Sequence, residues 1–265
     1  MSDNAIVTLT TDFGHKGPFV GVMKGVILSR LPDARIIDLT HEIHAHWPAE
    51  GGFWLSRSHG YFPAGTVHVA VVDPGVGTSR DIIAAEFDGQ TFLAPDNGIL
   101  AHILGDTPSV PVYKLGPACR EQLSGGEISA TFHGRDLFAP LAAEVAAGRL
   151  KISKIGEQVS EITPSLVEDP VVDNGKIQGA VVAVDSFGNL ISNIDGALLT
   201  SLKKPVARCG GKTLKLQDTY GRSQPGELLA LINSFGVVEI ARAESSAADY
   251  LGLGLGAPIV ISGDA

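Results

Sequence analysis

The amino-acid sequence predicts an N-terminal α/β sheet domain followed by a smaller C-terminal antiparallel β-barrel domain. Three observations lead to this prediction. The chain has 265 residues, which is enough for two domains. Its first part alternates short β-branched runs with helix-like stretches, and its last part consists of apolar runs separated by glycine turns. We expect an N-terminal α/β domain over residues 1–157, a linker over residues 158–169 and a β-barrel over residues 170–265.

The elements of the first domain follow from the periodicity of apolar residues. Strands are expected where β-branched and apolar residues form short runs, at residues 6–9, 36–39, 67–72, 82–87 and 90–94. Helices are expected where apolar residues recur at helical spacing, at residues 20–31, 50–59 and 137–148. Pro32 follows the first expected helix and Gly148 ends the last, as is usual beyond helix C-termini.

The second domain is predicted from its turns. A polar, proline-interrupted stretch at residues 158–169 separates the two parts of the chain. Beyond it, apolar runs are bounded by turn sequences at Asn174-Gly175, Gly188-Asn189, Gly210-Gly211 and Gly236. Frequent turns between short apolar runs are typical of antiparallel strands in a small barrel.

Composition excludes several classes of protein. The net charge of −9 disfavours nucleic-acid binding, which usually needs a basic face, and fits a cationic or zwitterionic small ligand. Cys119 and Cys209 lack a partner motif, so we expect no disulfide framework, no thiolate metal site and a cytoplasmic location. Since no export leader and no apolar run of about 20 residues is present, no membrane association is expected.

Acidic residues follow two of the expected strands. Asp12 comes just after the first strand, and Asp73 follows residues 67–72 and leads through a glycine-rich turn to Arg80. Ligands of open α/β sheets bind beyond the carboxyl ends of strands, so Asp12 is a candidate for binding ribose hydroxyls. Both acids also fit simple turn chemistry, and Asp73 with Arg80 fits a solvated ion pair. Gly75-Val76-Gly77 lacks the third glycine and the helix of a dinucleotide fingerprint.

Other polar motifs have a structural and a functional interpretation. His133 stands between an aromatic residue and a glycine before an expected helix, where a histidine is more often structural than catalytic. Pro95-Asp96-Asn97-Gly98 is mainly a turn sequence, with a role at a pocket edge as the minor alternative. His41, His44 and His46 alternate at a spacing that does not give a tetrahedral ligand set, so no metal is expected.

Two loops of the expected barrel combine an aromatic residue, a glycine and polar groups. The first contains Asp185, Phe187 and Asn189, and the second contains Ser234 and is followed by Arg242. An aromatic ring stacks on a flat base while an amide binds the edge of the base. Each loop is also an ordinary hairpin turn, so both interpretations stay open.

The order of the motifs is more specific than any one of them. They are, in sequence, Thr-Asp-Phe-Gly, Asp-Leu-Thr-His-Glu-Ile, Val-Asp-Pro-Gly-Val-Gly-Thr-x-Arg, Ala-Pro-Asp-Asn-Gly, Thr-Phe-His-Gly-Arg-Asp, Asp-x-Phe-Gly-Asn and Asn-Ser-x-Gly. This series, from about Ile6 to Leu255, closely resembles the S-adenosyl-L-methionine (SAM) hydroxide adenosyltransferases, or adenosine-forming SAM hydrolases, which are related to fluorinase and chlorinase. The resemblance implies an α/β domain, a β-barrel and a homotrimer that binds SAM between subunits. It also implies attack of water or hydroxide on the ribose C5′, giving adenosine and L-methionine without a cofactor.

The resemblance also implies roles for individual residues. Asp73, Arg80 and His133 match the water-activating triad of the family. The positions implied for substrate binding are Asp12 at the ribose hydroxyls, Asn189 and Arg242 at the adenine, Asp185 and Ser234 near the methionine end, and Phe187 in the loop of Asp185.

Two alternatives accompany this interpretation, a halogenase of the same fold and a non-catalytic sensor of SAM or adenosine. The halogenases carry another residue at the triad aspartate, so the presence of both Asp73 and His133 favours water as the nucleophile. Gly17 stands where the family usually has an acidic residue that contacts the substrate ammonium. Either His46 or Trp47 is expected to line the ribose, where the halogenases have a large aromatic residue.

Overall fold

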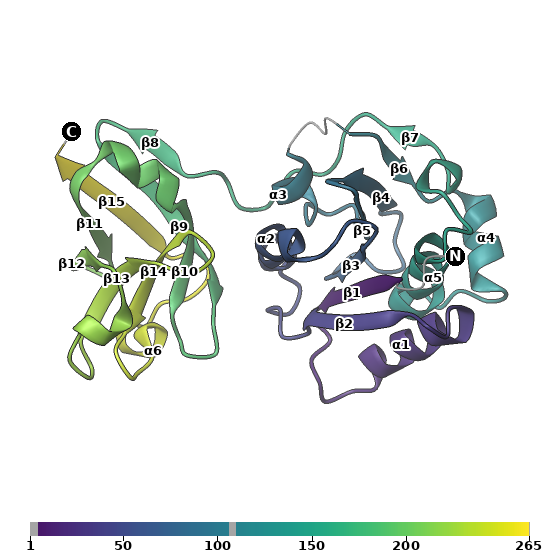
Figure 1. The fold of residues 1–265 in the computed structure, drawn as a ribbon, viewed down its shortest axis with the longest axis horizontal. Coiled ribbons are helices and arrows are strands. Elements are labelled where there is room, and N and C mark those ends of the chain that lie inside the picture. Colours follow the sequence, from purple (N-terminus) through teal and green to yellow (C-terminus); the bar gives the residue numbers. More distant parts are fainter. Residues whose placement is uncertain (1–4, 106–109, 265) are drawn as a thin grey trace. The chain divides into compact units, whose positions relative to one another are not determined.

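The computed structural model describes residues 5–105 and 110–264. It divides into two compact units, Met1–Leu166 and Val167–Ala265, and each is described by itself. The first unit is an α/β sheet domain and the second contains a closed β-barrel (Figure 1). The predicted fold class is therefore confirmed.

The first unit is built on a mixed sheet of seven strands in the order β2-β1-β3-β5-β4-β6-β7. The strands are β1 (Ile6–Thr11), β2 (Arg35–Thr40), β3 (Val67–Val71), β4 (Ile82–Phe87), β5 (Gln90–Pro95), β6 (Val112–Lys114) and β7 (Gln158–Val159). Strands β2, β1, β3 and β5 are parallel, and β4, β6 and β7 continue the sheet in antiparallel pairs. Because Thr11 pairs with Val71, the carboxyl ends of β1 and β3 lie side by side.

Helices cover both faces of this sheet (Figure 1). They are α1 (Phe19–Arg30), α2 (Pro48–Ser58), α3 (Ala101–Leu104), α4 (Pro117–Ser124) and α5 (Ala139–Ala146), with 3-10 turns at His59–Tyr61 and Ile152–Lys154 and a π-helical turn at Gly134–Phe138. Val69 and Val71 of β3 pack in one core with α1 and α5, whereas Ala70 and Val72 pack in the other with α2. Burial on both faces explains why residues 69–72 form an unbroken apolar run. No helix in the described part of the chain has both the length and the apolar character to cross a membrane.

The expected elements of the first unit differ from the observed ones mainly where segments are short. The strands β1 to β5 and the helices α1 and α2 lie where the sequence predicts them. The helix expected at residues 137–148 begins within the π-helical turn and ends at Ala146. Residues 158–159, expected in the linker, form β7 and pair with β6, because two residues are too few to show an alternating pattern. The domain bounds stay a prediction.

The second unit is a barrel of seven strands in the order β10-β14-β13-β12-β11-β15-β9, closed by pairing of β9 with β10, and β8 pairs with β9 outside the ring. The strands are β8 (Val171–Asp173), β9 (Lys176–Val184), β10 (Leu190–Asp195), β11 (Lys203–Cys209), β12 (Lys212–Gln217), β13 (Leu228–Ile232), β14 (Val237–Arg242) and β15 (Pro258–Asp264). Helix α6 (Ala247–Leu251) and 3-10 turns at Gly196–Ser201 and Tyr220–Arg222 join them. Apolar side chains fill the interior, among them Ile177, Val181, Ile240, Ile259 and Ile261.

One pair of barrel strands departs from the expected antiparallel arrangement. Strands β12 and β13 are parallel, with Leu216 beside Ala230. A parallel pair needs a crossover connection, and the segment with the Tyr220–Arg222 turn supplies it. The turn pattern did not reveal this, because it marks where strands end and not the direction in which the next one runs.

Candidate functional site

Asp73, Arg80 and His133 meet in the first unit. Arg80 Nε lies 3.0 Å from each carboxylate oxygen of Asp73, and Nη2 of the same guanidinium also donates to Asp73 Oδ2. Arg80 Nη2 also lies 2.8 Å from His133 Nδ1. The side chains of Asp73 and Arg80 are only 4% and 9% exposed, and His133 is 5% exposed. The three residues therefore form one buried polar group, and not the solvated pair and isolated histidine that spacing alone left possible.

The loop after β3 explains why residues so far apart in the sequence meet. Gly77 has a φ of +78°, and a Cβ atom there would lie 2.1 Å from the carbonyl oxygen of Ala130. Only glycine allows this close approach, which places the loop carrying Arg80 against the segment that leads to His133. Asn97 Nδ2 donates to the Val72 carbonyl oxygen at 2.8 Å and so fixes the end of β3 just before Asp73.

The contact with Arg80 determines the protonation of His133. An arginine side chain only donates hydrogen bonds, so His133 Nδ1 accepts, and in the neutral ring the proton is on Nε2. Burial lowers the pKa of His133, and the positive charges of Arg80 and Arg120 lower it further. His133 is therefore neutral at pH 7 and has a proton on Nε2 that it can donate to a ligand.

Asp12 lies at the end of β1, beside the end of β3. Its Oδ2 accepts the backbone N–H of His46 at 2.9 Å, which ties the turn after β1 to the loop before α2. The ring of the next residue, Phe13, lies 6.0 Å from that of Phe132, which precedes His133. These aromatic contacts connect the turn of Asp12 to the segment of His133, so the structure brings the predicted ribose ligand and the triad to one edge of the sheet.

The loop before α2 helps to choose between the two residues expected to line the ribose. His46 is exposed and has a left-handed φ of 64°, which is uncommon for a residue other than glycine. Trp47 is half-buried, and its Nε1 is buried with no hydrogen-bond partner among the described residues. A buried donor of this kind fits a ligand acceptor, so Trp47 is the better candidate.

The histidines near residue 41 have different surroundings. Within residues 5–105 and 110–264, no group of three or more His, Cys, Asp and Glu side chains is arranged to hold a metal ion. His41 is buried and contacts Thr11, whereas His44 and His46 are exposed. The backbone N–H groups of His44 and His46 bind Glu50 and Asp12.

Gly17 lies against an aromatic ring. A Cβ atom at Gly17 would lie 2.8 Å from two ring carbons of Phe19. The Phe19 ring is itself in contact with Phe13 and Phe132, at centroid distances of 6.0 and 5.4 Å. The absence of an acid at position 17 is therefore linked to the packing of Phe19, whose ring lies where a longer side chain would begin.

In the barrel, Asp185 folds the loop that contains three of the expected substrate ligands. Its Oδ1 accepts the backbone N–H groups of Phe187 and Asn189, and its Oδ2 accepts Asn189 Nδ2, all at 2.9 Å. Asn189 is buried, whereas the ring of Phe187 is 76% exposed. The turn role of Asp185 is thus real, and the exposed ring is accessible for stacking.

Helix α6 joins this loop to Arg242. The backbone N–H of Ala248 donates to the carbonyl oxygen of Gly188 at 2.9 Å, and the guanidinium of Arg242 lies 4.2 Å from the ring centroid of Tyr250, also on α6. The structure therefore brings Asn189 and Arg242 into one region of the barrel. Ser234 lies on a different hairpin, between β13 and β14, and is exposed.

Each of the two units matches a model of a known protein family. The model of the SAM hydroxide adenosyltransferase N-terminal domain matches residues 7–156, and that of the C-terminal domain matches residues 179–260. The chain belongs to the SAM hydroxide adenosyltransferase family. The matched regions include every residue of the predicted site.

The chain is also similar to individual members of this family over nearly its whole length. It is 36% identical to the (R)-S-adenosyl-L-methionine hydrolase of Salinispora tropica over 258 residues, with 96% of each chain covered. It is 36% identical to the enzyme of the same name from Thermus thermophilus, covering 96% of this chain and 98% of the relative. A fluorinase from Actinoplanes is 26% identical, covering 90% and 91%. The crystal structure of a conserved protein from Thermotoga maritima superimposes with a TM-score of 0.85 at 36% identity, covering 97% and 99% of the two chains.

The barrel contains a buried acid, Glu239, that the sequence pattern does not single out. Glu239 is 2% exposed and accepts hydrogen bonds from the Tyr220 hydroxyl at 2.6 Å and from Asn233 Nδ2 at 3.0 Å. Burial raises the pKa of Glu239, and the negative charge of Asp185 raises it further. Glu239 fixes the residue before Ser234. In the sequence it is one polar residue within an apolar strand, which gives no signal of this role.

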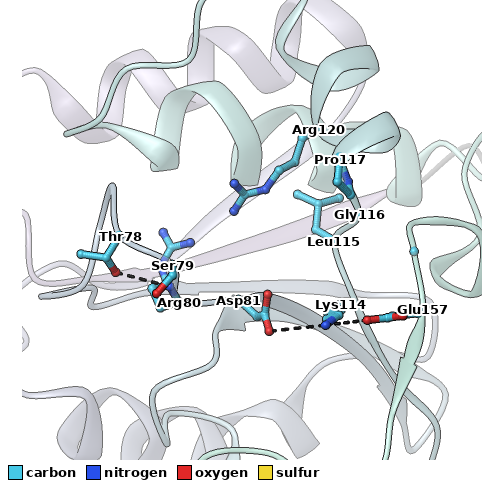
Figure 2. Close-up of a pocket in the computed structure, with 11 residues that line it drawn as sticks. Thr78, Ser79, Arg80, Asp81, Lys114, Leu115, Gly116, Pro117, Arg120 and Glu157 are labelled. Carbon is cyan, nitrogen blue, oxygen red and sulfur yellow. Dashed lines mark hydrogen bonds and ion pairs between the residues drawn. The ribbon is translucent and has the colours of Figure 1, made fainter.

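A cavity of about 520 Å³ lies beside the triad, and Figure 2 shows its lining. Arg120 extends from α4 toward Arg80 in this view, and Lys114 is paired with Glu157 at 2.5 Å and with Asp81 at 4.0 Å. Of the triad, Arg80 alone lines this cavity among the described residues. The cavity therefore adjoins the triad from the side of Arg80, where Arg120 adds positive charge.

Proposed function

We propose that this chain hydrolyses SAM by attack of water on the ribose C5′, giving adenosine and L-methionine. The observation that carries the proposal is the buried contact of Asp73 with Arg80 and of Arg80 with His133. The relatives named as SAM hydrolases support it, because they are 36% identical over nearly the whole chain, against 26% for the fluorinase.

The chemistry of the substrate sets what the site must supply. The sulfonium of SAM leaves as a neutral thioether, so the leaving group needs no acid. The nucleophile is harder to provide, because bulk water has a pKa of about 15.7. Forming free hydroxide at pH 7 would cost about 12 kcal/mol at roughly 1.36 kcal/mol per pKa unit. We therefore infer that the triad orients a water molecule in line with C5′ and removes its proton as the C–O bond forms.

The geometry supports distinct roles for the three residues. Asp73 is the proton acceptor, since a carboxylate has about four acceptor positions and Arg80 does not occupy all of them. His133 carries its proton on Nε2, so it orients the water and does not accept a proton at that atom. Arg80 holds both side chains. As the new O–C5′ bond forms, the C5′–S electron pair stays on sulfur, and one proton passes through Asp73 to solvent.

The remaining predicted residues are proposed to bind the substrate. Asp12 would accept hydrogen bonds from the ribose hydroxyls, with Oδ2 already oriented by His46. In the barrel, Phe187, Asn189 and Arg242 would bind the adenine, and Asp185 and Ser234 would bind near the methionine end. No cofactor is required by this scheme.

We also propose a homotrimer with sites between neighbouring subunits. Helix α1 supports an interface, because apolar residues occur on both of its faces: Val20, Met23 and Ile27 are buried, whereas Phe19, Val22 and Leu28 are exposed. Two free, buried cysteines fit a cytoplasmic location, and the net charge of −9 supports a small-molecule and not a nucleic-acid ligand.

Incubation of the purified protein with SAM in oxygen-18 water tests the reaction. Hydrolysis at C5′ places the label in the 5′-hydroxyl of adenosine, which mass spectrometry detects. Methylthioadenosine as the product, or no product, would overturn the proposal. Parallel reactions with chloride and fluoride test the halogenase alternative through the appearance of a 5′-halo-adenosine. Tight retention of adenosine without turnover would favour a sensor.

Single-turnover kinetics test the triad within the same assay. Asp73→Asn and His133→Ala should both lose most of the rate while they still bind SAM. Near-normal rates in both variants would show that the triad does not activate the water.

A further inference from the structure

A second buried polar group lies beneath the turn that carries Asp12. The Oγ1 of Thr11 lies 2.8 Å from Nδ1 of His41, and both residues are buried, with exposures of 0% and 1%. On the other side of the ring, His41 Nε2 lies 3.0 Å from Oδ1 of Asp38, a close but poorly aligned contact that is mainly electrostatic. Lys24 Nζ binds the other oxygen of Asp38 at 2.6 Å. We call Thr11, His41 and Asp38 the β1–β2 chain.

The charge of Asp38 decides which nitrogen of His41 carries the proton and therefore the direction of the hydrogen bond between Thr11 and His41. The negative charge of Asp38 favours a proton on His41 Nε2, so Nδ1 accepts and the Thr11 hydroxyl donates to it. The same hydroxyl oxygen accepts the backbone N–H of Phe13 at 3.2 Å. The Thr11 hydroxyl and His41 Nδ1 therefore have partners of the correct type, whereas His41 Nε2 faces Asp38 through an electrostatic contact alone.

The β1–β2 chain holds the residues on both sides of Asp12. Thr11 precedes Asp12, and Phe13, bound to the Thr11 hydroxyl, follows it. The carbonyl oxygen of His41 accepts the backbone N–H of Gly14 at 2.8 Å. The backbone from Thr11 to Gly14 is thus attached to one histidine, while the carboxylate of Asp12 is attached to the N–H of His46. Such an arrangement fixes the position of a carboxylate more tightly than a surface turn requires.

We propose that Thr11, His41 and Asp38 are positioning residues for substrate binding, which set the orientation of Asp12 toward the ribose hydroxyls. The inference rests on the proposed function, in which Asp12 binds the ribose. None of the three residues needs to touch the substrate. Their loss should weaken binding of SAM in the ground state and the transition state equally, which raises KM and leaves kcat almost unchanged.

Strand β1 contains a second threonine, Thr8, that offers a matched control for Thr11. Thr8 Oγ1 lies 2.8 Å from Nδ1 of His68, and both residues are fully buried. Thr8→Val and Thr11→Val therefore remove the same kind of buried hydroxyl-to-histidine bond from β1, within the strand and at its site end respectively. Both variants should lose thermal stability, and Thr11→Val should lose more, because the Phe13 N–H also loses its acceptor. Only Thr11→Val should raise KM for SAM, by about tenfold, with kcat within about twofold of the wild type.

Two further variants sharpen the test. Thr11→Ser keeps the hydroxyl and should restore KM to within about twofold of the wild type. Asp38→Ala lies on the edge strand β2, where the Asp38 side chain is 35% exposed, so this variant should fold even where Thr11→Val does not. It should raise KM about threefold. Lys24→Ala, which removes only the outer contact of Asp38, should have a smaller effect than Asp38→Ala.

The outcomes separate this inference from the proposed function. If the wild type makes adenosine and KM is the same in Thr11→Val and Thr8→Val, or unchanged in Asp38→Ala, the positioning role is wrong and the hydrolase proposal stands. If the wild type forms no adenosine from SAM, the proposed function fails, and the positioning role fails with it.

Discussion

Arg80 donates to His133 Nδ1 at 2.8 Å while the same guanidinium binds both oxygens of Asp73. One side chain therefore fixes the position of the carboxylate and the tautomer of the imidazole. A proton on His133 Nδ1 would face the N–H groups of Arg80, which can only donate hydrogen bonds. We therefore propose that the triad acts with an Asp73–Arg80 ion pair beside a neutral imidazole, an arrangement already present without substrate.

Arg80→Lys should abolish this arrangement although it keeps the charge. A lysine ammonium lacks the planar fork that binds two carboxylate oxygens and a ring nitrogen at once. We expect kcat to fall about 100-fold, with KM within about threefold of the wild type, since the loss is confined to the nucleophile side. Arg120→Lys is the matched control, because Arg120 lines the same cavity outside the triad, and its kcat should change little. Single-turnover rates of the two variants would decide, and equal rates would contradict the role of Arg80.

The acid limb of the pH profile should report His133, because protonation at Nδ1 would break the contact with Arg80 that holds the triad together. Burial and the charges of Arg80 and Arg120 lower the pKa of His133, so activity should persist below the ordinary histidine pKa of about 6.5. Arg120→Gln removes one positive charge, which favours the imidazolium and raises the pKa. The acid limb of kcat/KM should therefore move to higher pH in Arg120→Gln and stay in place in Arg149→Gln, an exposed control paired with Glu144. An unchanged limb in Arg120→Gln would mean that another group limits activity in acid.

The sequence predicted the strand-end acids but not the contacts that give them a role. Apolar runs followed by Asp12 and Asp73 predicted two carboxylates at the carboxyl edge of a parallel sheet, and β1 and β3 are indeed neighbours there. The contact of Arg80 with His133 depends on the close approach of Gly77 to Ala130. No spacing rule reveals that approach, so the triad was predicted only through the family resemblance. His41 shows the opposite case, since its local spacing drew attention to metal binding, whereas its role depends on the pairing of β1 with β2.

Stability in acid should depend on His68. This ring is fully buried, lies 4.9 Å from the ring of Phe92 and has its pKa lowered by burial to about 4. In the unfolded chain its pKa is about 6.5. Between these two values the unfolded chain binds a proton that the folded chain does not, so the free energy of unfolding falls as the pH drops from 6.5 toward 4. The loss is at most about 3 kcal/mol, and His68 has no such effect above pH 6.5.

Urea denaturation of His68→Gln across this pH range measures the effect. The variant should be less stable than the wild type at pH 7, because it loses the contacts with Thr8 and Phe92. Its stability should also depend less on pH between 6.5 and 4. His15→Gln, whose side chain is 66% exposed in the wild type, should follow the wild-type curve. Parallel curves for the wild type and His68→Gln would show that His68 does not cause the loss of stability in acid.

Restoring an acid at position 17 should require a change at Phe19. The Phe19 ring lies where a side chain at Gly17 would begin, and it contacts Phe13 and Phe132. Gly17→Asp should therefore displace the ring and lower the free energy of unfolding by about 1 kcal/mol, the size of one or two aromatic contacts. Because Phe19 is 47% exposed, the ring has room to move and the fold should survive.

The double variant Gly17→Asp with Phe19→Ala separates packing from recognition. Phe19→Ala alone removes the obstructing ring and is the reference for stability and for KM. If a carboxylate at position 17 reaches the ammonium of SAM, the double variant should have a KM about threefold lower than Phe19→Ala, which corresponds to a gain of about 0.7 kcal/mol. Equal KM values would show that the turn of Gly17 does not face the methionine end in this chain. The ammonium would then have to be recognised by other groups, of which Asp185 is the first to test.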